Sequence, residues 1–118
     1  MLSPEDQWKF ALGSFIYEFA RLEAYVFRQC AGIIGPGDTR KLTFGKRLDR
    51  IKAQLKQQSQ GQCEPTLALL RQARGLSKFR NDLLHNTEFH GGASPQLGEL
   101  QATLQQLDQL LRELGVPL

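Results

Sequence analysis

The sequence lacks the features of membrane, secreted and zinc-binding proteins. Its longest apolar runs are only a few residues, and Met1 is followed by Leu-Ser-Pro-Glu-Asp rather than by a basic stretch leading into an apolar segment. We therefore expect neither membrane insertion nor secretion, but a cytoplasmic protein. The two cysteines, Cys30 and Cys63, lack the paired spacing of a zinc site, so we expect buried thiols in preference to a disulfide.

The sequence also lacks alternating runs of β-branched residues, so it predicts no strand. Its 118 residues suit one domain, 1–118, and are too few for two cores of ordinary size. Hydrophobic residues make up 41% of the chain and charged residues 23%. These fractions are typical of a folded globular domain rather than a disordered chain.

What the sequence does contain is helical periodicity, with apolar residues at steps of three and four in four segments. Ser3 and Pro4 supply an N-cap and a first-turn proline for the first segment, which the Gly35–Asp38 stretch ends. The second helix is expected to start near Thr43, and the third to hold Pro65 in its first turn. The fold class is therefore all-α: an antiparallel bundle of four helices, with five as an alternative.

The last helix is expected to begin with Ser94 as N-cap and Pro95 at the first position, and to stop at Gly115 and Pro117. Its leucines form a heptad seam that either belongs to the core of the bundle or forms a dimer surface, and the core is favoured. The seam comprises Leu97, Leu100, Leu104, Leu107, Leu111 and Leu114.

Two charged residues interrupt apolar stripes. On a helical wheel Arg80 falls between Leu76, Leu83 and the other apolar residues of the third helix, and Glu23 falls inside the apolar arc of the first. A guanidinium group that is even half-buried needs a partner. We therefore predict an ion pair between Glu23 and Arg80, which either fixes the helix register or also prepares a site.

A polar flank borders Arg80 on the third helix. Asn81 and His85 are four residues apart and share one side, with Ser77 one turn earlier and Arg74 nearby. Histidine moves protons near neutral pH, arginine binds phosphate with a planar fork, and asparagine orients either group. This set suits RNA cleavage, in which a 2′-hydroxyl loses a proton and the leaving 5′-oxygen gains one, and no metal or cofactor is required.

Basic residues outnumber acidic ones, with a formal net charge of +3. This excess suits a polyanionic partner, although a solvated helix face gives the same statistics. If the partner is RNA, the basic residues expected to contact it are Lys46, Arg47, Arg50, Arg74 and Lys78.

The segment Arg80-Asn81-Asp82-Leu83-Leu84-His85 has the R-x4-6-H pattern of the HEPN superfamily, in its common R-N-x-x-x-H form on a late helix of a small bundle. Two further stretches are similar to small HEPN proteins: the long first helix with Arg21-Leu22-Glu23, and the segment 42–48. The chain therefore resembles a small stand-alone HEPN domain protein.

The resemblance implies a metal-independent endoribonuclease, with Arg80 and His85 at the active site, Asn81 assisting, and a composite cleft across a homodimer. Proteins of this kind act as toxins, in phage defence or in RNA processing, and an antitoxin or regulator would be encoded separately. One toxin branch carries a tyrosine two residues after the histidine. This chain has Thr87 there, so regulation through that tyrosine is not expected.

The alternative is a non-catalytic HEPN module that binds nucleic acid, a nucleotide or a protein partner. In that case the pair formed by Glu23 and Arg80 is purely structural. The environment of the motif distinguishes the two: Arg80 and His85 facing a basic groove favour cleavage, whereas enclosure of both within one subunit favours a scaffold.

Overall fold

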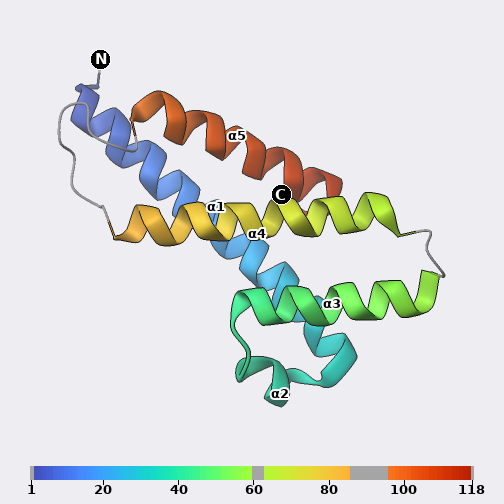
Figure 1. The fold of residues 1–118 in the computed structure, drawn as a ribbon. Helices are drawn as coiled ribbons and strands as arrows, with labels where there is room; N and C mark the ends of the chain where they lie inside the picture. The colour runs from blue at the N-terminus through green and yellow to red at the C-terminus, as the bar shows by residue number, and fades with distance from the viewer. Residues whose placement is uncertain (1, 60–62, 86–95, 118) are drawn as a thin grey trace.

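The computed structural model describes residues 2–59, 63–85 and 96–117, and within these ranges the chain is helical without strands. The prediction of an all-α bundle is confirmed for this part of the chain. The five helices are α1 (Pro4–Ile34), α2 (Pro36–Arg40), α3 (Phe44–Ser59), α4 (Glu64–Leu84) and α5 (Leu97–Glu113) (Figure 1).

The first helix begins and ends where the sequence predicts. The hydroxyl of Ser3 accepts a hydrogen bond from the backbone N–H of Asp6 at 3.1 Å, which satisfies one of the free donors of the first turn. Pro4 occupies the first turn, where its missing N–H costs nothing. At the other end Gly35 has φ of +88°, a conformation that favours glycine, and α1 stops before it.

The stretch after Gly35 was predicted to be a turn, but it contains the short helix α2. Pro36 begins this helix with a φ that already suits a first turn, and Asp38 complements the helix dipole. Thr39 is fully buried, and its hydroxyl donates to the carbonyl of Gly35 at 2.6 Å. The stretch that ends α1 therefore continues as a one-turn helix with a first-turn proline and a buried Thr39.

The predictions for the later helices hold except at the start of α5. Thr43 caps α3, since its hydroxyl accepts from the backbone N–H of Lys46 at 3.3 Å, and Pro65 lies in the first turn of α4. The last helix begins at Leu97 with Gln96 as its N-cap, two residues later than Pro95 predicted. Ser94 and Pro95 themselves lie outside the described residues.

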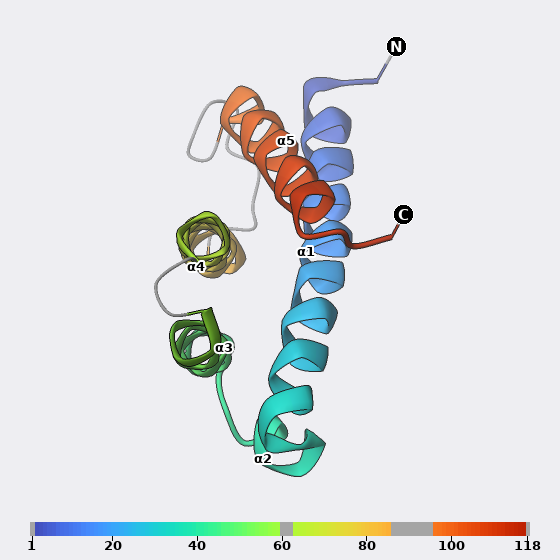
Figure 2. The same ribbon diagram turned by 90° about the vertical axis from the view of Figure 1, so that its right-hand side faces the viewer.

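The helices do not form a regular up-and-down bundle. In Figure 1, α3 and α4 run antiparallel, as do α4 and α5, whereas α1 crosses α3 and α4 obliquely. Figure 2 shows α3 and α4 nearly end-on beside the length of α1, with α5 packed on its N-terminal half. With 31 residues, α1 spans about 46 Å and serves different partners at its two ends.

One core joins the helices. Three leucines of the predicted seam, Leu100, Leu107 and Leu111, are buried in the core together with Leu110, and the other three, Leu97, Leu104 and Leu114, are half-buried against it. Cys30 and Cys63 are buried free thiols, as predicted. Not every apolar residue of α1 that follows the steps of three and four is buried. Its buried members are Trp8, Ala11, Phe15, Phe19, Leu22, Val26 and Cys30, whereas Ile16 and Ile33 are exposed.

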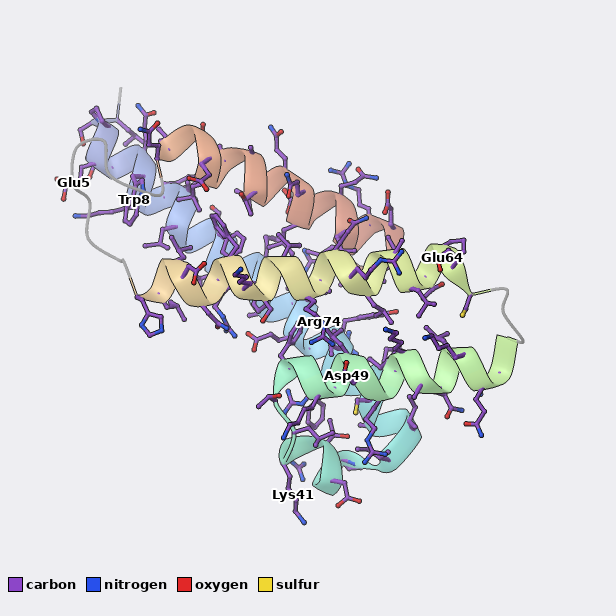
Figure 3. All side chains as sticks on the ribbon, in the orientation of Figure 1. Glu5, Trp8, Lys41, Asp49, Glu64 and Arg74 are labelled. Atoms are coloured by element: carbon purple, nitrogen blue, oxygen red, sulfur yellow. The ribbon has the colours of Figure 1, made fainter. Side chains whose placement is uncertain are left out.

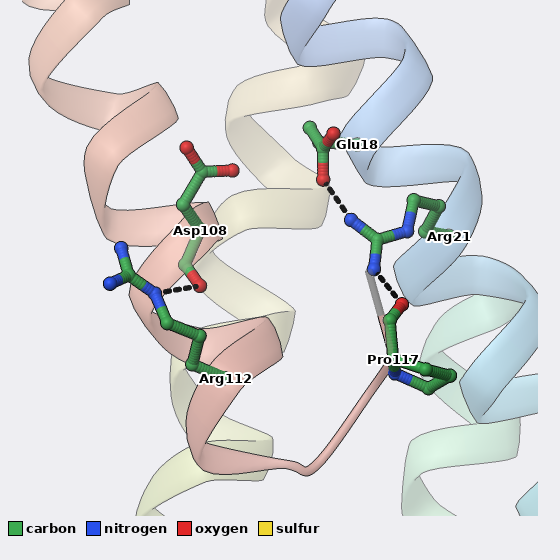
Figure 4. A network of polar contacts seen from close by, with 5 residues as sticks. All are labelled: Glu18, Arg21, Asp108, Arg112 and Pro117. Carbon is green, nitrogen blue, oxygen red and sulfur yellow. Dashed lines mark hydrogen bonds and ion pairs between the residues drawn. The ribbon is translucent and has the colours of Figure 1, made fainter.

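The carboxyl end of the chain is tied back to α1. The guanidinium group of Arg21 donates to Glu18 at 2.5 Å and to the carbonyl of Pro117 (Figure 4). After α5, Gly115 has φ of +75° and allows the chain to turn toward α1. Among the described helices, none is both long and apolar enough to cross a membrane.

Candidate nucleic-acid interface

Arg80 lies one turn before the end of α4, at the edge of the buried face. Its side chain is 21% exposed. The buried face near this end is formed by Leu76 and Leu83, with Phe79 half-buried beside them, and Leu84 is 50% exposed. The helical wheel placed Arg80 inside the apolar arc. In the structure Arg80 lies at the edge of the buried face instead, because the core-facing side of this end of α4 is rotated toward Phe79.

Three contacts hold the guanidinium group of Arg80. Its Cζ lies 4.7 Å from the centre of the Phe19 ring, Nη1 is 3.5 Å from Oε1 of Glu23, and Nε donates to Oδ1 of Asn81 at 3.0 Å. The predicted ion pair between Glu23 and Arg80 is present, and Asn81 orients the arginine. Among the described residues, Nη2 has no partner.

Phe19 is the contact that sequence reasoning missed. It is four residues before Glu23, so the two side chains lie on the same side of α1, where they contact one guanidinium group. A cation over an aromatic face contributes about 0.5–1 kcal/mol at an exposed site and more where water is excluded. The spacing of an aromatic residue and an acid on one helix was the available signal.

Arg80 and Asn81 line an open groove of about 380 Å³ between the start of α3 and the C-terminal half of α4. From α4 the lining includes Arg74, Ser77 and Lys78 as well, so the groove brings together three cationic side chains. The α3 wall is Thr43, Phe44 and Gly45, where a helix N-terminus adds partial positive charge. No carboxylate belongs to the described lining, and we name this feature the cationic groove.

One of the three cations also joins the two helices. Arg74 binds Oδ1 of Asp49 at 2.5 Å and the carbonyl of Gly45 at 3.1 Å, and Figure 3 shows Arg74 and Asp49 facing each other between α3 and α4. A Cβ on Gly45 would lie 3.1 Å from Nη1 of Arg74, so glycine leaves room for this contact. Arg74 and Arg80 are thus each paired with an acid, Asp49 and Glu23 respectively, whereas no ion pair of Lys78 is found among the described residues.

The remaining predicted RNA contacts lie outside the lining. Arg47 is half-buried, with its Cζ 5.1 Å from the centre of the Phe27 ring and its Nε donating to the carbonyl of Thr39 at 3.1 Å. It therefore fastens α3 to α1 and α2. Lys46 and Arg50 are exposed on α3.

His85 is exposed at the C-terminal cap of α4, beyond the groove lining. Its backbone N–H donates to the carbonyl of Asn81 at 3.3 Å. The two residues are four apart and therefore share a side of the helix, as predicted, but only Asn81 is part of the lining. Thr87, the other position compared with the toxin pattern, lies outside the described residues.

The described part of the chain contains no group of three His, Cys, Asp or Glu side chains able to hold a metal ion together. The described lining of the groove offers cations, hydroxyl groups and the amide of Asn81. Positioned cations that keep a free donor bind phosphate oxygens well. Comparisons of the chain with protein-family models, with curated proteins and with solved structures find no match.

Proposed function

We propose that the cationic groove binds the phosphate backbone of RNA, and that the chain is a metal-independent endoribonuclease of HEPN type. The observation that carries the proposal is the groove itself, where Lys78, Arg74 and an oriented Arg80 meet without an acid in the lining. Phe19, Glu23 and Asn81 hold the rest of the Arg80 group, and Nη2, which has no partner among the described residues, is the donor that we assign to a phosphate.

The chemistry divides between Arg80 and His85. The 2′-oxygen attacks phosphorus after losing its proton, the bond to the 5′-oxygen breaks, and the products are a cyclic phosphate and a 5′-hydroxyl. Arg80 stabilises the charge that gathers on the phosphorane oxygens. His85 moves a proton, and its exposed place one turn beyond Asn81 leaves it open to a bound strand.

A single Arg and a single His form a sparse site, so the proposal includes a homodimer in which two copies act together. Ribonucleases of this kind serve in toxin–antitoxin pairs, phage defence or RNA processing, and we place this chain among them. A separately encoded antitoxin or regulator would then control it.

A second candidate is a non-catalytic HEPN module that binds nucleic acid, a nucleotide or a protein partner. The observation that favours it is the separation of His85 from the groove lining. A module of this kind would use the cationic groove in the same way but would leave the RNA intact.

Cleavage of a mixed RNA pool in EDTA distinguishes the candidates. Wild-type protein is expected to cut, and His85→Ala is expected to bind RNA within about twofold of wild type, measured by fluorescence anisotropy, without cutting. Binding by both proteins with cutting by neither would support the non-catalytic module. The failure of both proteins to bind RNA would contradict RNA binding by the groove and would leave a nucleotide or a protein as the partner of a non-catalytic module.

A further inference from the structure

The long helix α1 has a second apolar face, opposite the one that enters the core. Phe10 is 72% exposed and Tyr17 67%, and Gly13, Ala20 and Ala24 are exposed beside them. On a wheel at about 100° per residue, Gly13, Tyr17, Ala20 and Ala24 fall within about 60° of one another. We name these five residues the α1 strip.

The α1 strip is uncharged over five helical turns. We consider an arc of about 120° on the helical wheel that includes the strip. Within residues 10–27, all of which the structure describes, this arc contains the five strip residues and two more apolar residues, Ile16 and Phe27. The solvent face of a surface helix is normally polar. Single exposed apolar residues are ordinary, whereas a continuous apolar strip indicates an interaction site. In Figure 2, α3 and α4 lie on one side of α1, and no other described helix covers the opposite side.

We propose that the α1 strip binds the same strip of a second copy of this chain, with the two α1 helices antiparallel. Large and small side chains are unevenly distributed along the strip. Phe10 and Tyr17 lie in its N-terminal half, and Ala20 and Ala24 in its C-terminal half. Antiparallel pairing places Tyr17 against a small residue of the partner, whereas parallel pairing places like against like.

Charges at the ends of the strip support the same direction. Asp6 lies on the strip side of α1 before Phe10, and Arg28 lies on that side after Ala24; both are exposed. An antiparallel partner brings Asp6 of one copy near Arg28 of the other. A parallel partner would instead align Asp6 with Asp6 and Arg28 with Arg28. Lys9 on the same side of α1 is paired with Glu5 at 3.3 Å, and the parallel alignment of Asp6 with Asp6 and of Arg28 with Arg28 is disfavoured by like charge.

The heptad spacing also sets the register. Positions 10, 17 and 24 alternate with 13, 20 and 27, and antiparallel helix pairs place one set against the other. The most extensive overlap sets Tyr17 against the partner's Ala20 and Gly13 against the partner's Ala24. Glycine and alanine at these levels let the two helix backbones approach closely.

The pairing has a consequence for the cationic groove. Glu23, which binds Arg80, lies at one edge of the strip. In an antiparallel pair the two-fold axis is perpendicular to the plane that contains both α1 helices. The edge of the strip that holds Glu23 therefore lies on the same side of this plane in both copies, and the two Arg80 sites face that side of the dimer. The two Glu23 residues are nine residues apart along the axis, which is about 14 Å. Laterally the two Arg80 sites lie further apart, because α4 is on the side of α1 opposite the strip. Their joint action on one RNA rests on the proposed function, whereas the dimer itself does not.

The area indicates a dimer that depends on concentration. Residues 10–24 span about 21 Å, and with a width of about 10 Å the strip covers about 210 Å² of each copy. Standard interfaces bury about 800 Å² on each partner. Sedimentation velocity over a wide concentration range is therefore expected to show a shift from 13.3 kDa toward twice that mass.

Two exposed alanines provide a matched test. Ala20→Glu introduces charge near the two-fold axis and is expected to remain monomeric at every concentration. Ala53→Glu makes the same change on the exposed face of α3 and is expected to dimerise like wild type. Circular dichroism melts establish that both variants are folded. A wild type that stays monomeric would overturn the proposal and assign the strip to another protein, and an Ala20→Glu variant that dimerises normally would overturn it as well.

Cysteine variants test the direction, because the native Cys30 and Cys63 are buried. Ala20→Cys is expected to form covalent dimers with a short bismaleimide, since equivalent positions lie close to the two-fold axis. Phe10→Cys is expected to form none, because antiparallel pairing separates its copies by about 25 Å. Cross-linking of both would contradict the antiparallel orientation. Sedimentation and cross-linking report the mass of the protein and do not depend on RNA. A protein that dimerises but binds no RNA would therefore contradict the proposed function and leave the proposed dimer intact.

Discussion

The two flanks of α4 carry grooves of opposite character. On the α3 side, the cationic groove of about 380 Å³ contains Arg74, Lys78 and Arg80. On the α5 side, a larger groove of about 900 Å³ is rich in uncharged amides. The second groove, which we name the glutamine groove, is lined by Gln72, Gly75, Leu76, Phe79, Ala102, Thr103, Gln105, Gln106, Gln109 and Glu113.

The two grooves differ in the charge of their described linings as well as in volume. RNA carries one negative charge per phosphate, and neutralising it supplies much of the binding free energy. The described lining of the glutamine groove has no Lys or Arg, and its ionised group is Glu113, which accepts from Gln109 at 3.1 Å. The smaller groove therefore has the charge that RNA binding requires.

The largest effect is expected from Arg80→Ala. The variant loses the oriented guanidinium group, so RNA affinity should fall tenfold or more, about 1.4 kcal/mol, and cleavage should cease. Fluorescence anisotropy and gel-based cleavage assays measure the two losses. The control is Arg71→Ala, which removes an equal charge from the exposed pair with Glu64 on the same helix. Equal weakening by both variants would indicate that net charge, rather than the groove, determines affinity.

A carboxylate placed in each groove separates them directly. Ser77 lines the cationic groove and Thr103 the glutamine groove, and both are half-buried. Ser77→Asp is expected to weaken RNA binding about five- to tenfold, because the new charge pairs with Lys78 or Arg80 and repels phosphate. Thr103→Asp is expected to bind within about twofold of wild type. The reverse order would move the RNA site to the α5 side.

Salt dependence measures the number of phosphates that the cationic groove neutralises. For a single strand each contact contributes about 0.7 to the slope of log affinity against log salt, so two or three contacts predict a slope of about −2. Lys78→Ala should reduce its magnitude by about 0.7. Affinities at four or more salt concentrations provide the slope. An unchanged slope would exclude Lys78 from the contact set.

A smaller effect, on stability, is expected where α5 contacts α1 and the carboxylate groups of Asp108 and Glu18 lie near each other. Asp108 lies near Glu18 and the guanidinium groups of Arg21 and Arg112 (Figure 4). Burial, reinforced by the charge of Glu18, raises the pKa of Asp108 above its usual 3.8. The folded protein therefore holds this proton more tightly than the unfolded chain, and stability falls as pH rises from 3.8 through the raised pKa.

Asp108→Asn removes that titration. The variant should be more stable than wild type near neutral pH, with a Tm about 2 °C higher, and the difference should vanish below about pH 3.8. Thermal melts at the two pH values provide the comparison. RNA affinity should stay unchanged because Asp108 is far from the cationic groove lining. A lower Tm at neutral pH would show that Asp108 is stabilised by its arginine neighbours instead.

Much of the fold could be predicted from the sequence because its signals are local. Ser3, Gly35 and Thr43 mark helix ends through their own side chains or backbone, and the leucine period of α5 identifies its core face. The helix α2 was missed because Gly-Pro-Gly-Asp is typical of a turn until the burial of Thr39 is known. The oblique crossing of α1 was also missed, since helix periodicity carries no information about interhelical angles.

The candidate site could be predicted only in part. Glu23 and Arg80 were paired from two interrupted stripes, and Asn81 was placed beside them, because one-helix spacing and the cost of a buried charge are local arguments. The α3 wall and the pairing of Arg74 with Asp49 depend on how two helices pack, so no spacing revealed them. For the same reason, the sequence grouped Arg47 with the RNA contacts, whereas it packs on Phe27.

The most direct measurement is an NMR titration of the folded protein with a short single-stranded RNA in EDTA. The His85→Ala variant keeps the RNA intact during the titration. The account predicts that the largest amide shifts occur at Gly45, Ser77, Lys78, Arg80 and Asn81, with little change along the glutamine groove. Shifts centred on Gln105, Gln106 and Gln109, with the cationic groove unchanged, would contradict it.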